Sequence, residues 1–176
     1  MQIPQPRGPL TEALLDALTS GSADFEHLLA VRPAPGEDAA LALWVLHELH
    51  YRGFDAVPDD LEWDPDLLRL RATLERDLEA RLRERFTPPA GLSFVEDFFD
   101  WLADQDGLSV AAHVQRHADR AQVEELLRVR SIYHLKEADP TAWVVPRLGT
   151  RAKAALVELQ YDEYGAGDPN RLHHHL

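Results

Sequence analysis

The stretch DPDLLRLRATLERDLEARLRER, residues 64–85, decides the fold class. Asp64 followed by Pro65 is typical of a helix start, because a capping carboxylate and an early proline both suit the first turn. Leucines then recur at steps of three and four, with arginine and glutamate on the other faces. These leucines are Leu67, Leu70, Leu74, Leu78 and Leu82. The stretch therefore predicts a long amphipathic helix.

Start and stop signals on both sides predict further helices. Thr11 is expected to cap a short helix carrying Leu14, Leu15 and Leu18, and Gly53 is expected to end a helix over residues 37–52. Downstream, helices are expected over about 119–136, over about 151–164 and from residue 168 onward. Strand alternation and internal repeats are absent from the sequence. The expected fold is all-α.

Bulk properties restrict the class of protein. The 176 residues predict one domain, with N-terminal helices over 1–90 and a helical bundle starting over 91–176. The chain has no cysteine, which excludes disulfides and thiolate chemistry. It lacks a signal peptide and any apolar run near twenty residues, so a cytoplasmic protein without membrane association is expected. A net charge of −13 disfavours nucleic acid as a partner.

Glu163 is the first candidate functional residue. Leu156 and Leu159, seven and four residues before it, share its helical face, which predicts a carboxylate on a buried side. Such a group needs an arginine, a proton or a metal ion beside it. In a straight helix His173 would point about 80° away from Glu163. Gly165 and Gly167 either distort the backbone so that the two side chains meet, or simply end the helix.

Glu137 and several histidines are further candidates. Glu137 is either a metal ligand or the partner of Arg130 in an ordinary ion pair. The run of histidines at 173–175 is a surface feature, a remnant of an expression tag, or the source of one ligand, since neighbouring helical side chains diverge by about 100°. His47-Glu48-Leu49-His50 fails the zinc-protease pattern because its histidines are three residues apart, and Glu48 remains an outside ligand candidate.

The C-terminal third resembles the iron-containing redox enzyme family, bacterial members of the haem-oxygenase-like non-haem di-iron oxidases and oxygenases. The similar segments are RSIYHLKEADP at 130–140, Trp143, PRL at 146–148, KAALVE at 153–158, DEYGAG at 162–167 and His173. Residues 46–54 and 62–65 are similar to the N-terminal region of the same family.

The resemblance implies a haem-oxygenase-like helical bundle, incomplete at the C-terminus because the last ligand-bearing helix would follow Leu176. The chain would then be the N-terminal half of such an enzyme. The implied metal ligands are Glu137, Glu163 and His173, and the implied cofactor is Fe(II), as one or two ions, with O₂ as co-substrate and no haem. The implied activity is oxidation or oxygenation of a small organic substrate, with Tyr133 and Trp143 as pocket walls.

Other classes of function stay open. A metal-free helical binding or assembly module would pair Glu137 and Glu163 with arginines and direct the histidines to solvent. A metal-free enzyme on the same bundle would bind a small aromatic molecule. A truncated bundle that exposes apolar faces would also tend to self-associate, for example as a homodimer.

Overall fold

The computed structural model describes all residues except 22–23, 88, 92–94, 106 and 174–176, and the described residues form helices and turns without a strand. The all-α expectation is therefore confirmed. Two compact units divide the chain, Met1–Val95 and Glu96–Leu176. A single domain spanning both units stays a prediction.

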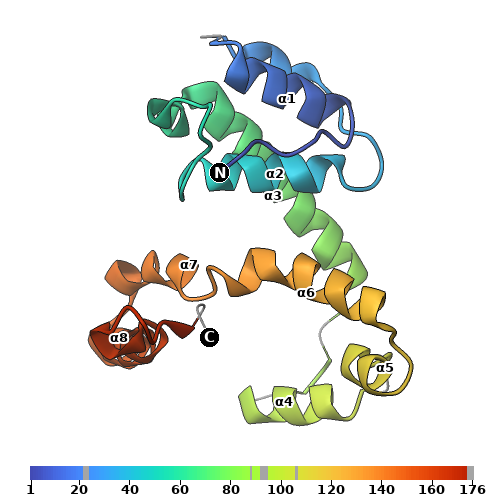
Figure 1. The fold of residues 1–176 in the computed structure, drawn as a ribbon, viewed down its shortest axis with the longest axis vertical. Coiled ribbons are helices and arrows are strands. Elements are labelled where there is room, and N and C mark those ends of the chain that lie inside the picture. Colours follow the sequence, from blue (N-terminus) through green and yellow to red (C-terminus); the bar gives the residue numbers. More distant parts are fainter. Residues whose placement is uncertain (22–23, 88, 92–94, 106, 174–176) are drawn as a thin grey trace. The chain divides into compact units, whose positions relative to one another are not determined.

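The first unit is a small bundle built around one long helix (Figure 1). Helix α1 contacts α2, and α2 contacts α3, while the 3-10 turns η1 and η2 pack against α3. The elements are α1 Pro9–Thr19, η1 Glu26–Ala30, α2 Asp38–Glu48, η2 Asp59–Trp63 and α3 Pro65–Arg85. Gly53, with φ +64°, donates its backbone N–H to the Glu48 carbonyl. The helix expected over 37–52 ends earlier, at Glu48, and residues 49–52 form the turn that Gly53 closes.

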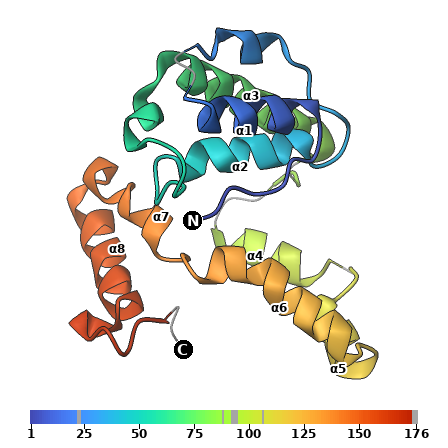
Figure 2. The same cartoon turned by 45° about the horizontal axis from the view of Figure 1, so that its top comes forward.

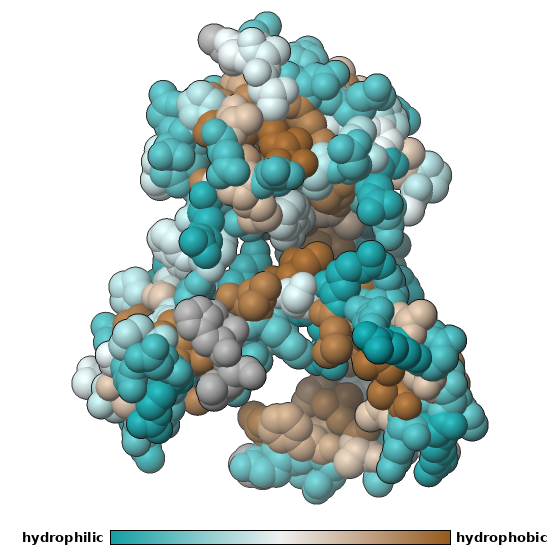
Figure 3. Space-filling model, viewed as in Figure 1, coloured by the Kyte–Doolittle hydropathy of each residue, from teal (hydrophilic) through white to brown (hydrophobic). Residues whose placement is uncertain are grey.

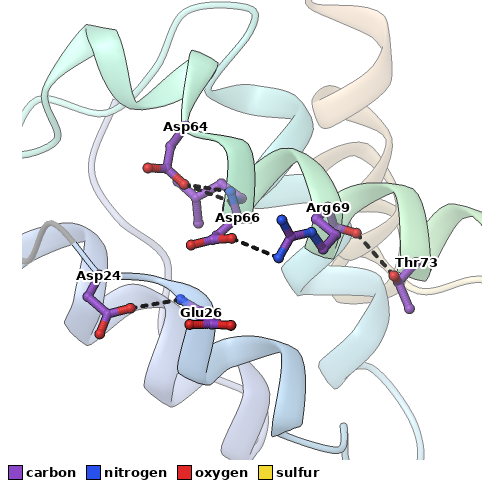
Figure 4. Close-up of polar contacts among 7 residues, drawn as sticks. Asp24, Glu26, Asp64, Asp66, Arg69 and Thr73 are labelled. Atoms are coloured by element: carbon purple, nitrogen blue, oxygen red, sulfur yellow. Dashed lines mark hydrogen bonds and ion pairs between the residues drawn. The ribbon is translucent and has the colours of Figure 1, made fainter.

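The start of α3 follows the sequence signal. The Asp64 carboxylate accepts hydrogen bonds from the backbone N–H groups of Asp66 and Leu67, at 2.9 and 3.1 Å, and Pro65 is the first helical residue (Figure 4). One turn later, Arg69 forms an ion pair with Asp66 at 3.0 Å. The cap satisfies N–H groups that have no partner inside the helix, which explains why so short a motif locates the boundary.

Only the first half of the leucine stripe of α3 lies in the core. Leu67, Leu70 and Leu74 are buried, whereas Leu78 and Leu82 are 40% and 56% exposed. The buried leucines join a single apolar cluster from α1, η1, α2 and the 54–57 turn, which includes Leu10, Leu14, Leu18, Phe25, Leu28, Val45 and Leu46. The stripe therefore indicates the inward face correctly, but the partners of α3 cover only its first turns.

A buried carboxylate ties α1 to α2. Asp38 accepts hydrogen bonds from the backbone N–H groups of Leu10, Thr11 and Ala34 and from the Thr11 hydroxyl, at 2.7 to 3.1 Å. Burial alone would raise the pKa of Asp38, but these hydrogen bonds outweigh it and leave the pKa lowered. The expectation that Thr11 caps α1 is wrong, because the helix begins at Pro9 after Gly8 and the Thr11 side chain lies one turn inside.

The second unit contains α4 Val95–Ala103, which starts at the boundary, then α5 Val110–Arg116 and α6 Arg120–His134 (Figure 2). Asp119 caps α6 by accepting from the Gln122 backbone N–H. The chain continues through α7 Asp139–Ala142, η3 Val145–Arg147, α8 Thr150–Glu163 and η4 Gly165–Gly167. Helix α5 was not predicted from the sequence, although the Ser109 side chain caps it by accepting a hydrogen bond from the Ala112 N–H.

Among its described residues, the second unit buries no apolar side chain. Large apolar side chains on α4 and α6 are exposed instead, and apolar surface is visible over both helices in Figure 3. Examples are Phe99, Leu102, Leu127, Val129 and Ile132, each 45% exposed or more. No helix in the described parts of the chain combines the length and the apolar composition needed to cross a bilayer.

Candidate metal-binding site

Glu163 is the last residue of α8, and its side chain is 25% exposed. The expected apolar face around it is only partly observed, because Leu156 is half-buried and Leu159 is 56% exposed. The inward face of α8 instead carries Gln160, which is buried, and the half-buried Tyr164 just after the helix. Glu163 therefore lies at the edge of the inward face, where it is partly shielded but reachable from solvent.

A tight reversal follows Glu163. Three consecutive residues have left-handed backbone angles: Gly165 with φ +66°, Ala166 with φ +56° and Gly167 with φ +86°. The chain after the reversal passes so close to Gly165 that a Cβ there would lie 2.6 Å from the carbonyl carbon of Arg171. The glycine is thus required by a close approach as well as by its φ angle. The helix expected from residue 168 is wrong, since residues 168–172 form turns.

The reversal brings His173 back to Glu163. The imidazole Nδ1 lies 2.6 Å from Glu163 Oε2, although ten residues separate the two positions. The histidine is 60% exposed, so the pair faces solvent on one side. Both roles considered for the glycines are observed, because α8 ends at Glu163 just before Gly165 and the reversal also brings the two side chains together. His174 and His175 lie outside the described residues.

A hollow of about 410 Å³ adjoins this pair. Its walls are Asp162, Glu163, Gly165, Ala166, Arg171 and His173. The expected wall residues Tyr133 and Trp143 do not line it and are 58% and 62% exposed. Glu163, His173 and Arg171 therefore share one small concavity that is open to solvent.

Glu137 lies apart from the pair. Helix α6 ends at His134, so Glu137 sits in the turn before α7, is exposed, and accepts a hydrogen bond from the Tyr133 hydroxyl at 3.2 Å. Among the described residues it forms no ion pair with Arg130, which the helical spacing had allowed. The predicted ligand and its alternative partner are thus not joined, and Glu137 keeps both oxygens near the surface.

Tyr133 connects the two carboxylates electrostatically. The pKa of its phenol is raised, first by the hydrogen bond to Glu137, then by the charge of Glu137, and further by the charge of Glu163. The phenol consequently keeps its proton and acts as a donor at neutral pH. Glu163 is close enough for its charge to act on a residue that touches Glu137, although the structure places no direct contact between the two acids.

Glu163 and His173 present donor atoms of the kinds that bind metal ions. Imidazole nitrogen and carboxylate oxygen both suit Fe(II), and one of each converges at Glu163 and His173. Within the described ranges, no group of three or more histidine, aspartate or glutamate side chains is close enough to hold one ion. The residues therefore fit two of the ligands of an iron site, and Glu137 has to approach before it can become the third.

The histidine motif of the first unit belongs to a different set of contacts. His47 pairs with Glu75 of α3 at 3.2 Å, and His50 pairs with Glu62 of η2 at 3.2 Å. Glu48, the outside ligand candidate, is 1% exposed and belongs to no metal-binding group among the residues described. His47 thus connects α2 to α3, and His50 connects the turn after α2 to η2.

Two polar contacts around Glu163 were not predicted. The Gln160 side-chain amide donates to the Thr141 hydroxyl at 3.0 Å, and the Tyr164 hydroxyl donates to Asp139 at 2.9 Å. The first contact joins α8 to α7, and the second joins the residue after α8 to α7. The only signal in the sequence was the spacing of a glutamine and a tyrosine four residues apart, which places both on one helical face. This spacing indicates that they contact the same neighbouring element but does not identify that element.

Comparison with known proteins agrees with the resemblance noted in the sequence. A sequence model of the family described as iron-containing redox enzymes matches residues 124–176, the C-terminal 53 of 176 residues. The match contains Glu137, Glu163 and His173, but it does not extend to 46–54 or 62–65, where similarity was also expected. No curated protein and no solved structure matches the chain. The C-terminal segment of this chain is thus similar to the family of iron-containing redox enzymes.

Proposed function

We propose that this chain contributes ligands to a non-haem iron centre that activates O₂ for the oxidation or oxygenation of a small organic substrate. Glu163 and His173 would hold the iron, and Glu137 would be the third ligand. The observation that carries the proposal is the 2.6 Å approach of His173 Nδ1 to Glu163 Oε2 within the family segment. A chain reversal containing Gly165 and Gly167 produces this approach.

The pair is suited to exchange a proton for a cation. The two side chains already share a hydrogen bond, so an ion held by both would take the place of the proton between Nδ1 and Oε2. Metal affinity should therefore weaken as the solution becomes more acidic. When bound, the iron would supply electrons to O₂, and one imidazole with one or two carboxylates would leave coordination positions open for O₂ and substrate.

Tyr133 would act on the third ligand. Its hydroxyl donates to Glu137 Oε1 and so holds one oxygen of that carboxylate while the other stays available. A hydrogen-bonded carboxylate is better oriented than a free one, as is common for the residues that support metal ligands. This role needs no apolar wall around Tyr133, consistent with its 58% exposure.

Iron binding can be tested by anaerobic Fe(II) titration of the full chain, followed by metal analysis and by absorption on admission of O₂. We expect Glu163→Gln to remove bound iron, because an amide is a far weaker ligand than a carboxylate. Glu158→Gln is the matched control, since Glu158 is an exposed acid on the same helix. Equal iron content in the two variants would exclude Glu163 as a ligand.

A metal-free helical assembly module is the second candidate. It is favoured by the exposed apolar side chains of α6, among them Leu127, Val129 and Ile132, which require a covering partner in a stable assembly. Its expected signature, an arginine beside each acid, is not found at Glu137 or Glu163 in the described residues. A chain that binds no Fe(II) but forms a defined oligomer in sedimentation experiments would support this alternative.

A further inference from the structure

Polar contacts hold the second unit together around the candidate site. Among its described residues, Gln160 is the only side chain with an exposed fraction as low as 9%, and no apolar side chain is buried. Apolar packing is largely non-directional, whereas a hydrogen bond demands a particular distance and angle. The relative position of α7 and α8 therefore depends on which donors meet which acceptors.

The first contact joins Gln160 to Thr141 across 19 residues. The Gln160 Nε2 group donates to Thr141 Oγ1 at 3.0 Å, and Thr141 Oγ1 donates in turn to the Ala138 carbonyl at 2.7 Å. The buried amide is thus connected to the backbone immediately after Glu137. Thr141 itself is exposed, so loss of the Gln160 amide would remove a contact that fixes position, while water can still satisfy the Thr141 hydroxyl.

The second contact joins Tyr164 to Asp139 across 25 residues. The Tyr164 hydroxyl donates to Asp139 Oδ1 at 2.9 Å. The pKa of Tyr164 is raised, first by burial and then by the hydrogen bond and charge of Asp139, so the phenol remains a donor at neutral pH. A hydrogen bond to a charged acceptor is stronger than one between neutral groups, which makes this contact suited to fixing a position.

We propose that Gln160–Thr141 and Tyr164–Asp139 form a polar clamp that positions Glu137 relative to Glu163 and His173. This inference rests on the proposed iron site. Gln160 and Tyr164 lie three residues before and one residue after Glu163, whereas Asp139 and Thr141 lie two and four residues after Glu137.

The geometry assigns the clamp residues a positioning role. They do not touch the metal, but they join the two segments that carry the proposed ligands. Glu137 is attached to Glu163 by no direct contact, so a small rotation of α7 against α8 would alter the distance over which Glu137 has to approach. Residues that support metal ligands in this way typically change metal affinity by about 10- to 100-fold when mutated.

The test uses Co(II) as a spectroscopic probe of the full chain. We expect Tyr164→Phe and Gln160→Met to bind Co(II) about 10-fold more weakly or worse and to change its visible absorption, because Glu137 no longer reaches the ion in the same geometry. Tyr161→Phe is the matched control, since Tyr161 lies on the same helix and is 58% exposed. Thermal unfolding of each variant reports whether it is folded at the temperature of the titration.

A second readout follows α7 and α8 without any metal. The chain has no cysteine, so Ala142→Cys and Ala155→Cys place spin labels at two exposed positions, one on each helix. We expect a narrow distribution of label distances in the parent and in Tyr161→Phe, and a broadened one in Tyr164→Phe. An unchanged distribution together with an unchanged Co(II) affinity in Tyr164→Phe would overturn the clamp.

Different results would disprove the iron site and the clamp. If the parent binds no Co(II), or binds it equally after Glu163→Gln, the iron site itself is wrong, and the clamp has no metal ligands to position. If binding depends on Glu163 but Tyr164→Phe and Gln160→Met match the parent in affinity and spectrum, the iron site stands and the clamp is wrong.

Discussion

Replacing Gly165 with alanine should separate His173 from Glu163. An alanine Cβ at this position would lie 2.6 Å from the Arg171 carbonyl carbon and 2.7 Å from its oxygen, both backbone atoms. Ordinary contact begins near 3.4 Å, so the 171–172 backbone has to retreat by about 0.8 Å, the difference between 3.4 and 2.6 Å. Backbone atoms cannot rotate away as a side chain does, and His173 is only two residues further along.

The expected change in the distance between His173 and Glu163 follows from the same contacts. If the retreat passes in full to His173, the Nδ1–Oε2 distance grows from 2.6 Å to about 3.4 Å, close to the limit of a hydrogen bond. Alanine at a positive φ angle costs a further 1–2 kcal/mol or so. Because His173 is 60% exposed, the lost contact itself contributes at most about 1 kcal/mol to stability.

Gly167→Ala provides the control. Gly167 also has a positive φ angle, +86°, but no atom lies within 4 Å of the site where its Cβ would be. Both variants therefore carry the backbone strain, and only Gly165→Ala carries the clash. Long-range ¹H–¹⁵N NMR of histidine-labelled protein, assigned with His173→Gln, should show an altered Nδ1 signal for His173 in Gly165→Ala alone. Identical spectra and equal unfolding temperatures in the two variants would refute the argument.

Two further predictions concern the first unit. Asp38→Asn should lower the free energy of unfolding at pH 7 by about 1–3 kcal/mol, because buried donors around Asp38 lose a charged acceptor. Since the folded-state pKa of Asp38 is lowered, its contribution is present above the unfolded pKa of about 3.9 and is lost as the pH falls through the folded value. Urea unfolding at pH 7 and pH 3 should thus show a smaller acid destabilisation in Asp38→Asn than in the parent. Leu70→Ala should lower the free energy of unfolding by about 2–5 kcal/mol and Leu82→Ala by less than about 1 kcal/mol, because only Leu70 is buried. Similar losses of stability in the two variants would contradict the position at which α3 leaves the core.

Helix starts and stops were largely predictable because they depend on neighbouring residues. Asp64 caps α3 and Asp119 caps α6 through N–H groups two or three residues away, and both boundaries agree with the sequence to within a residue. The prediction that Thr11 caps α1 was wrong because a distant residue takes part in the start of that helix. Thr11 is a good capping residue, but Asp38, 27 residues away, accepts its backbone N–H and bonds its hydroxyl, so the helix can begin earlier.

Burial was harder to predict than helical structure. The leucine spacing of α3 identifies a face, but whether Leu78 and Leu82 are covered depends on where α1, α2 and the turns end. In the same way, Leu159 suggested an apolar surround for Glu163, whereas α7 draws Gln160 and Tyr164 inward by hydrogen bonding to them. The spacing of apolar residues shows which face of a helix can be buried, but the neighbouring elements decide which residues on that face are covered.

The sequence alone determined that the chain is helical, where α3 and α6 begin, and which family the segment 124–176 resembles, because each of these depends on short-range patterns. Only the tertiary structure decided that the backbone reverses at Gly165 and returns His173 to Glu163, and that Glu137 remains apart. A glycine merely permits a left-handed turn. The contact across ten residues also needs room for the returning backbone, and that room exists only where Arg171 passes over a residue without a side chain.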